Sequence, residues 1–93
     1  MSDRILARHP DPAKHGTRID AAKYHAVREA ILAALADGPV AFERLIEAVQ
    51  GQIAATFDGS VPWYVTTVKL DLEARGEIER VPGQRPQHLR RTG

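Results

Sequence analysis

The stretch that most constrains the fold of this chain is LEARGEIERVPG, at residues 72–83. An apolar helical pattern reaches it and ends at Gly76, a residue type that readily adopts the left-handed conformation closing a helix. Residues 77–81 then place an isoleucine between two glutamates, which reads as a strand. Pro82-Gly83 fits the central pair of a type II turn, and residues 87–91 can return as a second strand. The sequence therefore predicts a helix followed at once by a short hairpin.

Three helical patterns precede this hairpin. The first begins at the N-cap Asp20 and ends at Gly38, the second covers about residues 41–53, and the third runs from the N-cap Ser60 to Gly76. Apolar residues recur in each at the spacing of one helix face, so the three faces should meet in one core. These residues are Tyr24, Val27, Ile31 and Leu35, then Phe42, Leu45, Ile46, Val49 and Ile53, then Val61, Val65, Val68 and Leu72, joined by Ile78 and Leu89 of the hairpin.

Residues 1–19 differ from the rest of the chain. They contain two prolines and a glycine and keep no apolar period, so we expect a flexible N-terminal arm followed by a folded domain over residues 20–93. Basic residues of such an arm could follow a DNA minor groove, although a mobile basic tail is the simpler interpretation. They are Arg4, Arg8, Lys14 and Arg18.

The element order and the motif LEARGEIER resemble the winged helix-turn-helix superfamily. There the third helix commonly ends in Leu-Glu-x-x-Gly, and an apolar residue opens the first strand of the wing. TRIDAAKY at residues 17–24 and WYVTTVKLDLEARG at residues 63–76 are similar to segments of a family of small bacterial winged-helix proteins labelled only as a domain of unknown function. The resemblance spans roughly residues 17–91. It implies a mainly α fold with a small β-hairpin, a three-helix winged helix-turn-helix domain with its wing tip at residues 82–86.

The resemblance implies a fold and not an activity, and our first hypothesis for such a fold is a protein that binds double-stranded DNA, as a dimer and in transcriptional control. The third helix would enter the major groove while wing arginines hold phosphates. Residues 80–91 carry four arginines and no acid, which favours a local anionic partner. A solvated edge hairpin would explain these charges equally well. The residues expected at the DNA are Thr66, Thr67, Lys69, Arg80, Arg85, His88, Arg90 and Arg91.

The outer face of the third helix also supports an alternative. It carries Trp63 and Leu70, where a helix that reads the major groove usually carries Arg, Lys, Asn or Gln. The link over residues 54–60 is also longer than the turn of a compact helix-turn-helix. The alternative is a protein-interaction or dimerisation module that uses the Trp63/Leu70 face without binding DNA. A third interpretation is that the link or the N-terminal arm covers both side chains.

Other function classes are not expected. The chain has no cysteine, which excludes disulfides, a thiol nucleophile and Cys-ligated zinc. Its four histidines lack metal-ligand spacing and no Gly-rich phosphate loop occurs, so we expect no enzyme, cofactor or metal. No apolar run is long enough for a membrane span. The N-terminal residues carry charges and prolines where a secretory signal needs an apolar stretch, so a cytoplasmic protein is expected.

Overall fold

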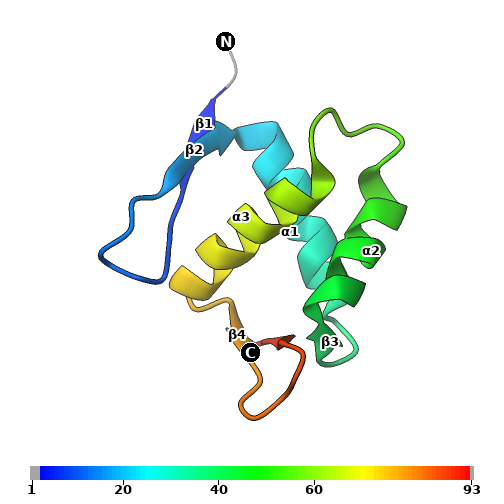
Figure 1. The fold of residues 1–93 in the computed structure, drawn as a ribbon. Coiled ribbons are helices and arrows are strands. Elements are labelled where there is room, and N and C mark those ends of the chain that lie inside the picture. The colour runs from blue at the N-terminus through cyan, green and yellow to red at the C-terminus, as the bar shows by residue number, and fades with distance from the viewer. Residues whose placement is uncertain (1–2, 93) are drawn as a thin grey trace.

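Three α-helices form the body of the protein in a computed structural model that describes residues 3–92 (Figure 1). They are α1 (Ala21–Ala34), α2 (Phe42–Ile53) and α3 (Val61–Ala74). The ranges predicted for the second and third helices are confirmed to within about one residue. The first helix ends about one turn before Gly38, because the chain tightens there into turns that join residues three apart. No helix within residues 3–92 has the length and apolar character needed to cross a membrane.

The helix ends follow from local chemistry. The Asp20 carboxylate accepts a hydrogen bond from the backbone N–H of Lys23 at 3.2 Å, and the Ser60 hydroxyl accepts one from the N–H of Trp63 at 3.3 Å. Both side chains are therefore the N-caps that the sequence predicted. Helix α2 begins without a side-chain cap, also as expected.

Gly76 ends α3 in the predicted way. Its φ is 75°, and its N–H donates to the carbonyl of Glu73 at 3.1 Å. The next N–H, of Glu77, donates to the carbonyl of Leu72 at 2.9 Å. This pair of bonds is the Schellman motif, which satisfies the last carbonyls of a helix and turns the chain sharply away. The turn sends the chain directly into the C-terminal hairpin.

The C-terminal hairpin consists of β4 (Ile78–Arg80) and β5 (His88–Arg91). A third strand, β3 (Val40–Ala41), pairs with the other edge of β5 and gives an antiparallel sheet in the order β3-β5-β4. The sequence predicted the hairpin but not β3, because two residues are too few to show a strand pattern. Gly83 has the positive φ, 76°, that the second central position of a type II turn requires.

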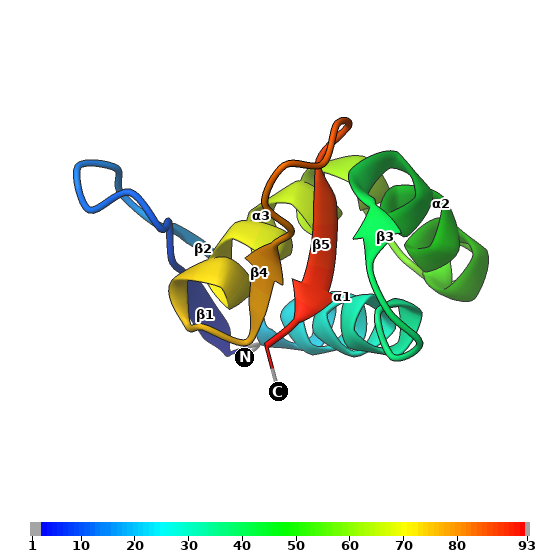
Figure 2. The same ribbon diagram turned by 90° about the horizontal axis from the view of Figure 1, so that it is seen from below.

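A second hairpin replaces the flexible arm expected over residues 1–19. Strand β1 (Arg4–Ala7) pairs antiparallel with β2 (Thr17–Asp20), and the loop of residues 8–16 joins them (Figure 2). Ala7 and Ile19 point into the core and are buried. This hairpin was not predicted, because each strand is only four residues long and two prolines interrupt any period between them. The fold is therefore mixed α/β, with two small sheets where one hairpin was predicted.

The predicted inner faces of the helices do meet in a single core. Ile31 of α1, Leu45 of α2 and Val68 of α3 are all fully buried, at 0% exposure. Ile78 and Leu89 of the hairpin close one end of this core. The second helix is less deeply placed than predicted, since Phe42, Ile46 and Ile53 are only partly buried.

Candidate nucleic-acid interface

One face of α3 remains open to solvent. On this face Trp63, 47% exposed, and Thr66 are exposed, while Thr67 and Leu70 are half-buried. The Thr66 hydroxyl donates to the carbonyl of Pro62 at 2.9 Å, a bond within the helix. Figure 2 shows the loop of β1–β2 and the loop of β4–β5 both extending to the side of α3 that lies away from α1. Of the two loops, the β1–β2 loop adjoins α3 at Thr67 and Leu70.

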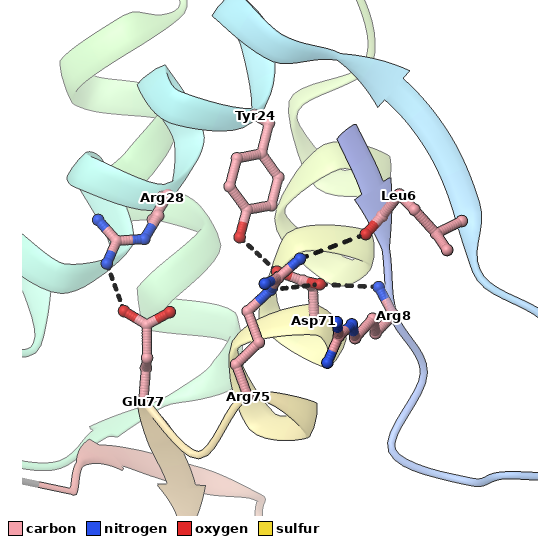
Figure 3. Close-up of polar contacts among 7 residues, drawn as sticks. All are labelled: Leu6, Arg8, Tyr24, Arg28, Asp71, Arg75 and Glu77. Atoms are coloured by element: carbon pink, nitrogen blue, oxygen red, sulfur yellow. Dashed lines mark hydrogen bonds and ion pairs between the residues drawn. The ribbon is translucent and has the colours of Figure 1, made fainter. Parts of the chain in front are cut away.

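A buried carboxylate holds β1 against α3 and α1 (Figure 3). Asp71 is fully buried and accepts from the backbone N–H of Arg8 at 2.8 Å and from the hydroxyl of Tyr24. The Arg75 Nε lies 3.0 and 2.9 Å from the two Asp71 oxygens, and its guanidinium also donates to the carbonyl of Leu6 at 3.5 Å. A buried charge with this many partners fixes the elements that supply them.

The same network shifts the pKa values of Tyr24 and Arg75. Burial, with the hydrogen bond and the negative charge of Asp71, raises the pKa of Tyr24 to about 12. The hydrogen bond to Asp71 also raises the pKa of the Arg75 guanidinium. Tyr24 therefore stays a hydrogen-bond donor throughout the neutral range, which suits a structural role for this cluster.

Lys69, one of the residues expected at DNA, is not on the open face. Its ammonium is 2.9 Å from the Glu73 carboxylate and 5.1 Å from the centre of the Phe42 ring, and its side chain is buried. The reason is its position on the helix: Lys69 follows Val65 by four residues and precedes Leu72 by three, the spacing of one helix face. Lys69, which the sequence expected at the DNA, is thus buried beside Glu73 and Phe42.

The arginines of the C-terminal hairpin fall into two groups. Arg85 is exposed in the β4–β5 loop, and Arg80, with a side chain 57% exposed, lies 3.6 Å from the carboxylate of Glu73 on α3. The contact with Glu73 places Arg80 on the side of the hairpin next to α3. His88, also expected at DNA, is half-buried, and its Nδ1 lies 2.7 Å from the carbonyl oxygen of Pro86.

The second group faces a different part of the surface. Arg90 pairs with Glu79 at 2.6 Å, and Arg90 and Arg91 line a cleft of about 610 Å³ together with Arg28, which forms an ion pair with Glu77. The C-terminal end of α1 and the turn after it form the rest of this cleft. The arginines that the sequence treated as one basic cluster are thus divided between two surfaces.

Leu70 and Trp63 have different surroundings. Leu70 and Thr67 border a small hollow of about 70 Å³ whose other wall is the β1–β2 loop, so the N-terminal segment does cover Leu70 in part. Trp63 stays exposed and packs edge-to-face on Tyr64, with ring centres 4.9 Å apart. Tyr64 packs in turn on Phe57 from the segment between α2 and α3. The interpretation that the chain covers both side chains therefore holds only for Leu70.

Comparison with known proteins gives a family but no described activity. A family model described as "Family of unknown function (DUF6958)" matches residues 4–89. The match begins in β1 and ends in β5, so it includes the N-terminal hairpin as well as the helices. No curated protein and no solved structure matches the chain. The chain belongs to this family of unknown function, DUF6958.

Proposed function

We propose that this protein is a winged-helix protein that binds double-stranded DNA through α3 and the β4–β5 loop, which would be the wing. The observation that carries the proposal is the open outer face of α3 beside a projecting, arginine-bearing hairpin loop. The element order supports it, because a short strand between the first two helices pairs with the C-terminal hairpin to give the sheet β3-β5-β4. In winged-helix proteins the third helix and the wing form the DNA-binding surface.

The proposed contacts differ in kind. Thr66 and Thr67 would approach the groove, and Arg80 and Arg85 would approach phosphates. Arg80 can exchange its exposed 3.6 Å pairing with Glu73 for a phosphate, since such a partly exposed pair contributes little. The face of α3 carries few side chains able to form bidentate bonds to base edges. Binding should therefore depend mainly on phosphate contacts and discriminate weakly among sequences.

The test is a titration of the protein with a random-sequence duplex at several salt concentrations. Replacing Arg80 and Arg85 with Ala removes the two basic groups proposed to hold phosphates, so the slope of log affinity against log salt should flatten by about 0.9 per lost contact, about 1.8 in all. Replacing Arg90 and Arg91 with Ala removes the same charge from the same hairpin but from the other surface, and should leave the slope close to that of the wild type. Absence of duplex binding by the wild type at low salt would exclude the proposal.

A second candidate is a protein-interaction or dimerisation module centred on Trp63 and Leu70. The observation that favours it is the exposed Trp63 indole, since exposed aromatic side chains are enriched at protein interfaces. Association through this face should persist as salt rises. Sedimentation of the wild type and of Trp63→Ser at high salt tests it. A dimer that the substitution abolishes would support this candidate, and a wild type that stays monomeric would exclude self-association.

A further inference from the structure

We infer that the loop of the N-terminal hairpin, residues 8–16, is a second DNA-contacting element, which holds phosphates on the side of α3 away from the β4–β5 loop. This inference rests on the proposed function and assigns a role to a part of the chain outside the helix and the wing.

The first argument is the position of the loop beside α3. The loop forms one wall of the small hollow whose other wall is Thr67 and Leu70 of α3. Figure 2 shows the N-terminal hairpin beside α3, with the β1–β2 and β4–β5 loops both extending away from α1.

The second argument is that the loop is held in place. The Arg8 backbone at its start donates to the buried Asp71 at 2.8 Å, and the adjoining strands bury Ala7 and Ile19 in the core. At the far end of the hairpin the N–H of Ala21 donates to the carbonyl of Asp3 at 2.8 Å. Basic groups fixed in advance lose less conformational entropy on binding than groups on a mobile arm.

The loop also has internal structure. The Asp11 N–H donates to Nδ1 of His9 at 3.0 Å, and the Asp11 carboxylate accepts from the N–H of Ala13 at 3.0 Å. The carbonyl of Asp11 accepts from the N–H of Lys14, also at 3.0 Å. The carboxylate of Asp11, the one acid of the loop, thus shapes the turn, and the loop carries one more basic than acidic side chain, Arg8 and Lys14 against Asp11.

The third argument is charge. Arg8 and Lys14 of the loop and Arg18 of the adjoining strand β2 are exposed, and none of them forms an ion pair within residues 3–92. Together with Arg80 and Arg85 they give exposed cations to both of the hairpins that adjoin α3. A duplex is the partner this arrangement fits, because a helix in the major groove has a phosphodiester strand along each side.

The experiment compares two triple variants with the wild type on the same random-sequence duplex. In one variant Arg8, Lys14 and Arg18 are replaced with Ala. The matched control replaces Arg4, Arg90 and Arg91 with Ala, which removes the same charge from exposed or half-exposed positions away from the loop. Each substitution keeps the backbone, so the bond from Arg8 to Asp71 is preserved, and the amide spectrum of each variant verifies its fold.

We expect the loop variant to bind at least tenfold more weakly at low salt and to show a salt slope flattened by about 2.7, or about 0.9 for each contact. The control should keep the wild-type slope, and amides of residues 9–16 in the wild type should shift on titration. If the wild type binds duplex but the loop variant keeps its slope, the inference is wrong while the proposed function stands. If the wild type binds no duplex, both are wrong. If an acidic polypeptide binds the loop as tightly as duplex does, the partner is misassigned.

Discussion

Replacing Asp71 with Ala should detach the N-terminal hairpin and destabilise the whole fold. Asp71 is fully buried, and its removal leaves the Tyr24 hydroxyl and the Arg8 N–H without their acceptor. Removing one partner of a buried charged pair typically costs about 3–5 kcal/mol. Arg75 moderates this loss because its side chain is 33% exposed and can turn to solvent. We therefore expect a loss of about 3–4 kcal/mol, a large share of the roughly 5–15 kcal/mol that stabilises a domain.

Urea unfolding followed by circular dichroism measures this loss. Glu47→Ala is the control, since it removes an acid whose side chain is 66% exposed and should change stability by less than about 0.5 kcal/mol. Hydrogen exchange adds a local readout, because the amides of Ala7 and Arg8 should lose protection in the Asp71 variant before those of α2. A loss below about 1 kcal/mol, the scale of one ordinary hydrogen bond, with unchanged protection in β1, would refute the role given to Asp71.

Three further predictions concern the fold. Gly76→Val should lower the free energy of unfolding by about 1–2 kcal/mol. An added Cβ would meet no atom within 4 Å, but the positive φ of 75° is unfavourable for a β-branched residue. A change within about 0.5 kcal/mol would contradict the role of Gly76 in ending α3. Ile31→Ala and Leu45→Ala should each lower the free energy of unfolding by about 2–4 kcal/mol, and Val68→Ala should lower it by less. Urea midpoints near the wild-type value would contradict the shared core. The raised pKa of Tyr24 contributes stability that is complete below pH 10 and is lost as pH rises towards about 12. The free energy of unfolding should fall by roughly 3 kcal/mol over this range. Urea unfolding at alkaline pH should show this fall in the wild type but not in Tyr24→Phe.

The sequence predicted the parts of the fold that local chemistry determines. The caps Asp20 and Ser60 and the helix stop at Gly76 depend on bonds within a few residues, so they could be read directly. The helical periods likewise identified the buried faces. Strand β3 and the N-terminal hairpin depend instead on pairing with residues distant in the chain, such as Val40 with Leu89, and such short strands carry no period of their own.

The surface assignments were less predictable, because they depend on where side chains meet. The spacing of Lys69 from Val65 and Leu72 already indicates that the Lys69 side chain faces inward. For Asp71 the available signal was its place in an apolar helix with Arg75 four residues later, a spacing at which opposite charges pair. Nothing local distinguishes Arg80, which lies near Glu73 of α3, from Arg91, which lines the cleft at the end of α1, since only the packing of the hairpin separates them.

The most direct test of the proposed DNA binding is an amide NMR titration of the wild-type protein with a random-sequence duplex at low salt. We predict chemical-shift changes in three segments, α3 around residues 63–70, the β4–β5 loop at residues 82–86 and the β1–β2 loop at residues 9–16, all of which weaken as salt is added. An unchanged spectrum at low salt, where the electrostatic attraction is strongest, would contradict DNA binding.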